Sequence, residues 1–298
     1  MKADTLVGPV LVTGGSGFIG KALCRALTAR GETVIVYDIG TADARNEHPS
    51  LRHETGDIRD LDSLISAARR HGVNAIVHLA AMVIPGCRAR PVLGAEVNVI
   101  GHINVMEAAR QLGISKIVYT SSLAARSRGP LDSPLNLYGA YKQCCENISK
   151  IYFLDHGVNS IGLRPNVVYG PEREDGETAA ITLAIKAAAD GRPYTLPFGG
   201  EMCFQHIDEV TDIFMRCLAA APERPVVSDV TTDVCSTEDL VAAIKAVVPE
   251  ARIEIAPVRR AGPTQIDNTP LRELLGAWPA VSLEDGVRRT VEAFRSRR

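Results

Sequence analysis

Apolar runs of strand length alternate with segments of helical period through the first 122 residues of the chain. This pattern predicts strands at 8–14, 33–38, 75–81 and 116–122 and helices at 18–31, 61–72 and 91–113. The strands are almost wholly apolar, which is typical of parallel strands that are covered on both faces. The alternation therefore predicts an α/β fold built on a doubly wound parallel sheet with right-handed crossovers.

Composition excludes several classes of protein. The net charge of −2 gives no basic surplus for a phosphate backbone, so we expect no nucleic acid partner. The seven cysteines show no CxxC or Cys/His pairing, which indicates free thiols of a reducing compartment and no metal site. No apolar run reaches the length of a membrane span, and no signal-peptide pattern precedes the first strand. We therefore expect a cytoplasmic protein without a membrane partner.

The segment GGSGFIG stands between the first strand and its helix. Glycines at this junction let the backbone turn tightly and approach a pyrophosphate, whose charge is met by the N–H groups at the helix N-terminus. The segment predicts a dinucleotide-binding loop. Its expected cofactor-binding residues are Gly14, Gly17, Phe18, Ile19 and Gly20.

Asp38 ends the second predicted strand, where a carboxylate can accept both hydroxyls of the adenosine ribose. An acid there repels a 2′-phosphate, so NAD is favoured over NADP as the cofactor. Arg45 lies nearby and weakens this preference.

Other segments also suit a dinucleotide. GDIRD places Asp57 and Ile58 where they can contact adenine, and Asn98 lies within an apolar helix, where a buried amide needs a partner. His78 is interpreted as a core residue, because a single histidine on an apolar strand is usually satisfied within the core. The strand end HLAA adds three expected cofactor contacts, Leu79, Ala80 and Ala81.

The stretch YGAYK contains two tyrosines and a lysine. A helix advances about 100° per residue, so Tyr138 and Lys142 share a face while Tyr141 points elsewhere. A free tyrosine ionises near pH ~10, but an adjacent ammonium and a positively charged nicotinamide favour the phenolate. Tyr138 is therefore the predicted base and Lys142 its partner, which also holds the nicotinamide ribose. Ser121 or Ser122, at the end of the fourth strand, can orient the substrate oxygen.

With these motifs the chain resembles the extended short-chain dehydrogenase/reductases, which are also described as the NAD-dependent epimerase/dehydratase family. The motifs TGGSGFIG, GDIRD, HLAA, YTSS, YGAYK, LRPNVVYGP and SLEDGVRRTVEAF occur in the order of that family. The resemblance implies a Rossmann domain, NAD as cofactor, and Ser122, rather than Ser121, as the catalytic serine with Tyr138 and Lys142. It also implies that Arg164, Pro165 and Asn166 line the nicotinamide and substrate side, and that the protein is a homodimer formed through a four-helix bundle.

Beyond residue 165 the elements become shorter and are separated by Gly and Pro. We expect an NAD-binding Rossmann domain at 1–165 with a returning segment near 203–235. The ranges 166–202 and 236–298 are expected to build a smaller C-terminal substrate-binding lobe.

Departures from the family pattern bear on the substrate. Leu123 and Ala124 stand where the dehydratases of the family carry an acidic pair, which argues against a dehydratase. Met202 and Cys203 stand where the family usually has Arg-Asp, the arginine gripping a nucleotide diphosphate, while Arg260 is retained as an expected substrate contact. Half of the expected diphosphate grip is therefore missing.

These observations predict an NAD-dependent oxidoreductase that acts on a secondary alcohol, or its ketone, in a sugar or sugar-derived acid. The alternative is a nucleotide-sugar 4-epimerase of the UDP-glucose type, which uses the same residues. A third hypothesis, a dinucleotide-sensing protein without turnover, is disfavoured by the intact Ser122, Tyr138 and Lys142 set.

Overall fold

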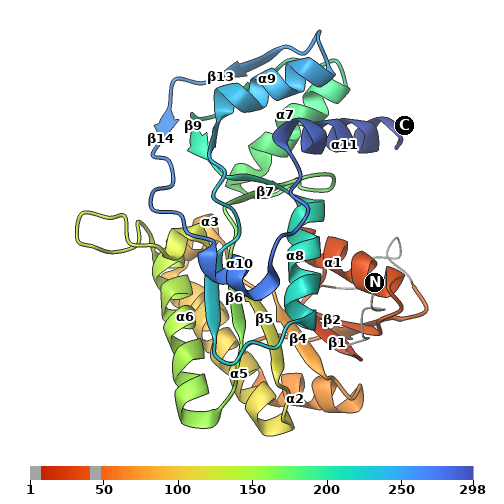
Figure 1. Ribbon diagram of the computed structural model, residues 1–298, viewed down its shortest axis with the longest axis vertical. Helices are drawn as coiled ribbons and strands as arrows, with labels where there is room; N and C mark the ends of the chain where they lie inside the picture. The colour runs from red at the N-terminus through yellow and green to blue at the C-terminus, as the bar shows by residue number, and fades with distance from the viewer. Residues whose placement is uncertain (1–7, 41–47, 298) are drawn as a thin grey trace. The chain divides into compact units, whose positions relative to one another are not determined.

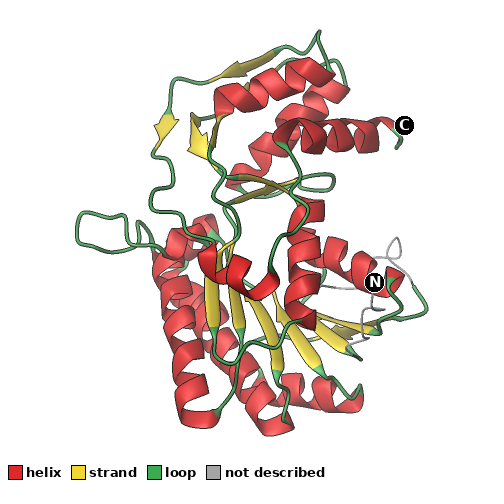
Figure 2. Ribbon diagram, viewed as in Figure 1, coloured by secondary structure: helices red, strands yellow, loops and turns green. Residues whose placement is uncertain are grey.

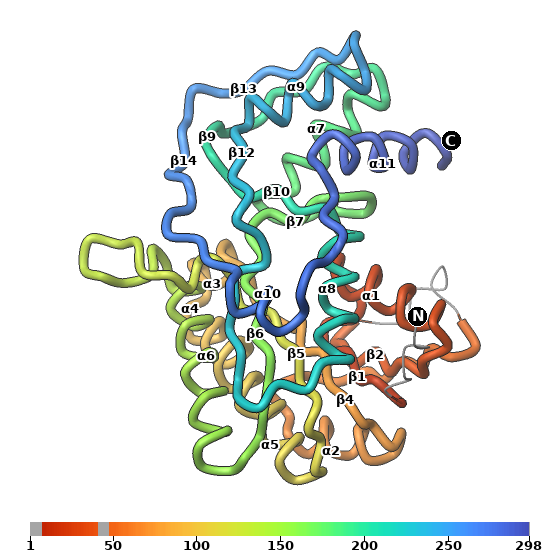
Figure 3. Tube along the Cα trace, in the orientation of Figure 1, coloured from red at the N-terminus to blue at the C-terminus, as the bar shows by residue number. Residues whose placement is uncertain are grey.

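The computed structural model describes residues 8–40 and 48–297, in which two compact units are distinguished (Figure 1). Unit 1 comprises Met1–Arg164, Thr211–Val230 and Thr269–Ala277, and unit 2 comprises Pro165–Val210, Thr231–Asn268 and Trp278–Arg298. The chain thus leaves unit 1 after residue 164 and returns to it twice, a course that can be followed in Figure 3. The sequence predicts one return, near 203–235, whereas the contacts place 211–230 and also 269–277 with unit 1.

Unit 1 is built on a parallel sheet of seven strands that is flanked by helices (Figure 2). Across the sheet the strands are β11 (Val226–Asp229), β6 (Ile161–Arg164), β5 (Lys116–Thr120), β4 (Ala75–His78), β1 (Val10–Thr13), β2 (Val34–Asp38) and β3 (Leu51–Thr55). The strand order reverses between β1 and β4, and this is where ligands bind in sheets of this kind. The predicted doubly wound parallel sheet is confirmed.

The central strands are buried on both faces. Val10, Leu11 and Val12 of β1 are fully buried, as are Val34 and Ile35 of β2. On one face, Leu11 and Ile35 join a core cluster with apolar residues of α2 and α5. Burial on both faces explains why these strands read as continuous apolar runs.

Unit 1 also contains helices and short helical turns. They are α1 (Phe18–Ala29), α2 (Leu61–Arg70), α3 (Ile84–Ala89), α4 (Pro91–Ala95), the π-helical turn η2 (Glu96–Ile100), α5 (Gly101–Leu112), the 3₁₀ turn η3 (Leu123–Ala125), α6 (Leu137–His156) and α10 (Thr269–Leu275). Helix α8 (Ile207–Ala219) begins in unit 2 and continues in unit 1.

Two features of unit 1 differ from the sequence prediction. The predicted helix at 91–113 contains the π-helical turn at Asn98, where the backbone bonds widen around a buried amide. Strand β3 is not among the strands that the sequence predicts, because its residues are mostly polar, and in the structure they are partly exposed. It lies at the edge of the sheet, where one side of the strand has no neighbour to cover it.

Unit 2 combines short strands with three helices, α7 (Ala180–Ala189), α9 (Thr237–Val247) and α11 (Leu283–Arg295), and the 3₁₀ turn η4 (Glu177–Ala179). Its strands are β7 (Val167–Tyr169), β8 (Tyr194–Leu196), β9 (Gly199–Met202), β10 (Phe204–His206), β12 (Cys235–Ser236), β13 (Ile253–Ile255) and β14 (Arg259–Arg260). They pair as β10-β7, β12-β9-β14 and β13-β8. A separate core cluster joins the three helices, with Ile181, Leu240 and Val287 fully buried within it.

None of the described helices combines the length and apolar character that crossing a membrane requires.

Candidate active site

The loop between β1 and α1 is held tightly by glycine. Gly14 has a φ of +69°, and a Cβ on it would lie 2.6 Å from the backbone nitrogen of Ala80. A Cβ on Gly20 would lie 2.4 Å from the carbonyl oxygen of Gly14. Helix α1 begins at Phe18 with no side-chain cap at Gly17 and no acid in its first turn. The backbone can therefore approach a pyrophosphate closely at the N-terminus of a helix, where the helix dipole favours negative charge.

Asp38, at the end of β2, faces this loop. Its carboxylate accepts hydrogen bonds from the backbone N–H groups of Ser16, at 3.0 Å, and Gly40, at 3.2 Å. These two bonds orient the carboxylate and leave lone pairs that can accept the hydroxyls of a ribose. Arg45, which weakens the predicted preference for NAD, lies outside the described residues.

The segment after β4 runs beside the same loop. The N–H of Leu79 donates to the Thr13 carbonyl at 3.0 Å, and that of Ala80 lies 3.4 Å from the Thr13 hydroxyl. His78 is buried and its ring nitrogen is 2.8 Å from the same hydroxyl, which agrees with the interpretation of His78 as a core residue. Ala81 follows directly in this segment.

Asp57 and Ile58 lie after β3. The carboxylate of Asp57 pairs with Arg59 at 2.6 Å, and this guanidinium lowers the pKa of Asp57. Ile58 is buried, and its carbonyl accepts from the Asn104 amide at 3.0 Å. Asn98 donates from Nδ2 to the carbonyls of Gly94, at 2.9 Å, and Met82, at 3.0 Å. In the structure these bonds hold the helical turn, so a contact of Asn98 with the cofactor stays a prediction.

Tyr138 and Lys142 lie one turn apart near the start of α6. Tyr138 is half-buried, whereas Lys142 is buried, and its Nζ donates to the Thr120 carbonyl at 2.8 Å. Burial lowers the pKa of Lys142 because it disfavours the charged ammonium. Tyr141 points elsewhere and donates its hydroxyl to the Pro91 carbonyl at 2.9 Å. The structure thus separates the two tyrosines of YGAYK as helical geometry predicts.

The two serines after β5 have different surroundings. Ser121 is buried and donates its hydroxyl to the carboxylate of Glu146. Ser122 is half-buried and accepts a hydrogen bond at Oγ from the Ala124 N–H at 3.1 Å. This bond uses a lone pair, so the O–H of Ser122 is left to donate to a substrate oxygen. Of the two serines, only Ser122 has the exposure that contact with a substrate requires.

Helix α6 packs directly on the turn that follows Ser122. A Cβ on Gly139 would lie 2.1 Å from the carbonyl oxygen of Ala124. Asn136 caps the helix by accepting from the Gly139 N–H at 2.9 Å. The missing side chain at Gly139 lets the start of α6, with Tyr138, approach η3 and Ser122 at its head.

Two of the predicted substrate residues, Asn166 and Arg260, belong to unit 2, with Pro165 at its start. Asn166 accepts at Oδ1 from the Cys203 N–H at 3.0 Å, and its own N–H donates to Gln205 Oε1 at 3.1 Å. Arg260 stacks on the Phe198 ring, with 3.6 Å between the guanidinium carbon and the ring centroid. Arg260 also pairs with Glu177 at 2.8 Å.

Arg164, which the resemblance assigns to the nicotinamide and substrate side, is paired with Glu146 and Asp229. It belongs to a buried charged network next to the serines that sequence reasoning missed and that also contains Arg126. One signal was available. Glu146 follows Lys142 by four residues, so an acid lies on the same face of α6 as the predicted catalytic pair. Asp229 and Arg126 are far apart in sequence and gave no such signal.

Within residues 8–40 and 48–297, no group of three or more His, Cys, Asp or Glu side chains is arranged to hold a metal ion.

A parallel sheet with a glycine loop between its first strand and helix defines the class of dinucleotide-binding α/β enzymes. Residues 10–250 match the model of the NAD dependent epimerase/dehydratase family. The chain belongs to this family and is an NAD-dependent enzyme.

Three individual proteins show how similar this chain is to characterised enzymes and solved structures. The UDP-glucose 4-epimerase of Mycolicibacterium smegmatis is 31% identical over 96% of this chain and 98% of its own length. The structure of the Thermus thermophilus UDP-glucose 4-epimerase in complex with NAD is similar with a TM-score of 0.82 and 26% identity, covering 96% of this chain and 99% of that one. An L-threonine dehydrogenase from Clostridium difficile has a TM-score of 0.86 at 20% identity, over 98% and 99% of the two chains. At that identity the likeness shows the fold alone.

Proposed function

We propose that this enzyme oxidises a secondary alcohol of a sugar or sugar-derived acid, or reduces the corresponding ketone, at Ser122, Tyr138 and Lys142. When bound, NAD accepts the hydride from the alcohol carbon. The chain's own task is to hold the alcohol and to remove its hydroxyl proton.

Tyr138 takes that proton as its phenolate. The buried ammonium of Lys142, 5.8 Å from the centroid of the Tyr138 ring, stabilises the negative phenolate in a poorly solvated setting. Ser122 donates its O–H to the substrate oxygen and so fixes the oxygen toward Tyr138. Lys142 is also proposed to hold the nicotinamide ribose.

The proposed cofactor site consists of the glycine loop, Asp38 and the segment after β4, all within unit 1. The structure fits NAD in three respects: the backbone closeness at Gly14 and Gly20, the absence of an acidic residue in the first turn of α1, and the oriented Asp38 carboxylate. Asp57, Ile58, Asn98 and Pro165 are proposed as further contacts. Unit 2, with Asn166 and Arg260, is proposed to bind the substrate.

One observation favours a dehydrogenase over an epimerase of nucleotide sugars. Met202 is 6% exposed and belongs to the core of unit 2, while Cys203 is fully buried and its N–H is bonded to Asn166. Neither side chain supplies the positive charge that a diphosphate requires. An epimerase must keep its substrate bound while the reacting sugar ring rotates. This chain lacks one of the positive side chains that would hold the diphosphate during that rotation.

A UDP-glucose 4-epimerase is the second candidate, and the relatives favour it. The mycobacterial epimerase is 31% identical over 96% of this chain. Arg260 is retained, and its stacking on the Phe198 ring orients its guanidinium. A diphosphate could bind this guanidinium in place of Glu177.

A panel of substrates with NAD distinguishes the two candidates. We suggest D-glucose, D-gluconate, L-threonine and UDP-glucose, with the absorbance of reduced nicotinamide as the readout and chromatography of the sugar products alongside. Formation of NADH with a small alcohol supports the dehydrogenase. Conversion of UDP-glucose to UDP-galactose without net NADH supports the epimerase.

We also propose a homodimer. Exposed apolar residues lie on the helical segments that the resemblance assigns to a dimer interface: Ile100 is 47% exposed, and on α6 Ile151 is 52% and Leu154 is 73% exposed. Covering these side chains with a second copy removes apolar surface from water. Sedimentation velocity tests the dimer, and Leu154→Glu is expected to yield monomers.

A further inference from the structure

We infer that Arg126 is a positioning residue for Ser122, and that it acts through a buried ion-pair network which fixes Ser122 from both sides. This inference rests on the role proposed above for Ser122. Arg126 does not touch the reacting atoms in this account, and it sets where the Ser122 hydroxyl lies.

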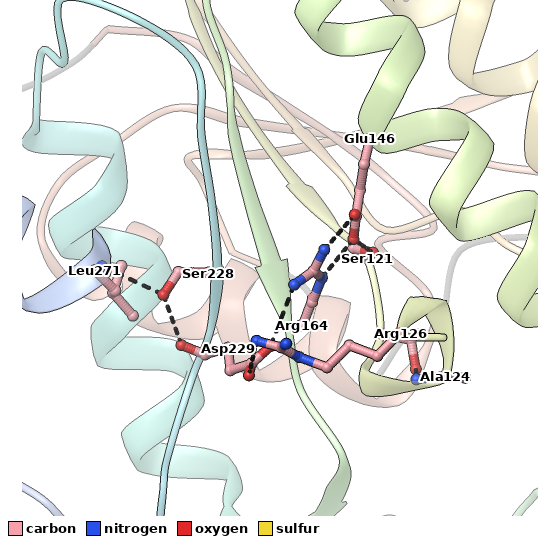
Figure 4. A network of polar contacts seen from close by, with 9 residues as sticks. Ser121, Ala124, Arg126, Glu146, Arg164, Ser228, Asp229 and Leu271 are labelled. Atoms are coloured by element: carbon pink, nitrogen blue, oxygen red, sulfur yellow. Dashed lines mark hydrogen bonds and ion pairs between the residues drawn. The ribbon is translucent and has the colours of Figure 1, made fainter. Parts of the chain in front are cut away.

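The network links four charged side chains of unit 1 to Ser121 (Figure 4). Ser121 donates to Glu146, and Glu146 accepts two hydrogen bonds from Arg164, through Nε at 2.7 Å and Nη2 at 2.5 Å. The second amino group of Arg164 lies 3.6 Å from Asp229. Asp229 in turn accepts from Arg126 through Nε at 3.1 Å and Nη2 at 2.5 Å.

The acidic side chains of this network are buried, so each of them requires a positive partner. The Asp229 side chain is fully buried and that of Glu146 is 3% exposed, whereas Arg164 and Arg126 are 17% and 23% exposed. Two buried carboxylates need positive partners, and the two arginines balance their charge. Both arginines use paired guanidinium N–H groups, which fix distance and direction together.

The two ends of the network enclose Ser122. On one side, Ser121 precedes Ser122 and is bound to α6 through Glu146, which lies two turns after Tyr138 on the same helix. On the other side, Ser122 heads the turn η3, and Arg126 closes it with its N–H bonded to the Leu123 carbonyl at 3.2 Å. Ser122 thus lies in sequence between Ser121, which is bonded to Glu146, and Arg126, which is paired with Asp229. Arg164 contacts both of these acids.

The chain after Arg126 enters a loop that is exposed at several positions. Ser127 is exposed, and Leu131 in the following loop is 85% exposed. Leu123 and Ala125 of η3 are buried, Gly139 packs on Ala124, and the pair between Arg126 and Asp229 links the end of the turn to β11. Without the Arg126 side chain, the C-terminal end of η3 loses its ion pair with β11 and can shift, while α6 keeps its place. Ser122 then moves relative to Tyr138.

A double-mutant cycle between Arg126 and Ser122 tests this coupling. The variants are R126M, S122A and S122A/R126M, assayed with whichever panel compound gives the highest kcat/KM. Misplacement of one catalytic group costs on the order of 10- to 100-fold, so we expect R126M to lower kcat by about that factor with KM changed less than about twofold. In the S122A background, R126M is expected to change kcat by less than about twofold, because the hydroxyl that it positions is absent. R126K, which keeps the charge but loses the paired geometry, is expected to fall between R126M and the unmodified enzyme.

R110M is the matched control, because Arg110 makes the same kind of paired contact to Glu107, but on the exposed side of α5. We expect R110M to leave kcat unchanged. If R126M lowers kcat by the same factor with and without Ser122, Arg126 acts on stability or elsewhere and the inference fails. If S122A itself keeps full activity, the proposed role of Ser122 fails first, and the inference fails with it.

Crystal structures of the NAD complexes of the unmodified enzyme and R126M provide a readout that needs no substrate. We expect Ser122 Oγ to move by about 1 Å or more while Tyr138 and Lys142 stay in place, a displacement of the size that impairs catalysis. Should R126M not crystallise, R126K serves, with a smaller displacement expected. An unmoved Ser122 in either variant contradicts the inference.

Discussion

The Lys142 ammonium lies 5.8 Å from the centroid of the Tyr138 ring and donates to the Thr120 carbonyl at 2.8 Å. A single helix, α6, carries both residues, and the carbonyl at the end of β5 fixes the lysine within the protein. The pair is therefore tied to the strand that leads into Ser122. In the proposed mechanism this arrangement stabilises the phenolate of Tyr138 without exposing the lysine to water.

Tyr138→Phe is expected to lower kcat by at least about 100-fold, because it removes the proton acceptor. NAD binding, measured by calorimetry, should stay within about twofold of the unmodified enzyme, since the ring is retained. Tyr141→Phe is the matched control, because Tyr141 bonds to the Pro91 carbonyl. Loss of activity in the Tyr141 variant alone would show that the wrong tyrosine has been chosen.

Lys142→Met is expected to abolish turnover and yet to leave the protein at least as stable at pH 7. Burial lowers the pKa of Lys142 in the folded state, so between that pKa and the ordinary lysine pKa the unfolded chain binds more protons. The free energy of unfolding of the unmodified protein therefore increases as the pH rises through this window and decreases as the pH falls. At pH 7 the melting temperature of the variant should equal or exceed that of the unmodified protein. The difference between the two should shrink as the pH is raised to about pH 9.5. A variant that melts well below the unmodified protein at pH 7 would be at odds with this account.

Asp38→Asn is expected to weaken NAD binding by about 10-fold, because charged hydrogen bonds to the ribose are lost. Binding of NADP should change less or improve, since the repulsion of its 2′-phosphate is removed. Fluorescence titration with NADH and with NADPH measures the ratio of the two dissociation constants. An unchanged ratio would mean that Asp38 does not contact the ribose.

Gly139→Ala is expected to lower both stability and kcat, because its Cβ would lie 2.1 Å from the Ala124 carbonyl oxygen. Overpacking of this kind costs about 1–3 kcal/mol and separates α6 from the turn behind Ser122. Gly157→Ala is the control, since Gly157 has a φ of +69° and no atom within 4 Å of the added Cβ. The control should lose about 1 kcal/mol of stability through backbone strain and keep its kcat. Equal kcat in the two variants would show that the approach of α6 to η3 does not matter for catalysis.

The sequence was sufficient to predict the parallel sheet, because burial on both faces makes the central strands continuously apolar. Strand β3 was missed because an edge strand with polar side chains carries no such signal. The helical spacing of Tyr138 and Lys142 is local and was therefore readable. Between Ser121 and Ser122, the residues alone left both serines open, and their burial distinguishes them.

The charged network was not predicted, because it depends on tertiary contacts. Arg126 and Asp229 are 103 residues apart in sequence, and only the pairing of β11 with β6 brings Asp229 next to Arg164. A single sequence does not show which arginine a buried acid contacts. The division of the chain between the two units has the same origin, because the return of 269–277 to unit 1 depends on packing against β11.

The most direct test of the central claim follows the hydride in the purified enzyme. Incubated with NAD and the most active small alcohol of the panel, the enzyme is predicted to release NADH in amounts equal to the oxidised product, and UDP-glucose is predicted to remain unconverted. Chromatography of the sugars and absorbance of the cofactor in the same reaction measure both quantities. Protein that purifies with tightly held NAD and converts UDP-glucose to UDP-galactose without net NADH would contradict the account.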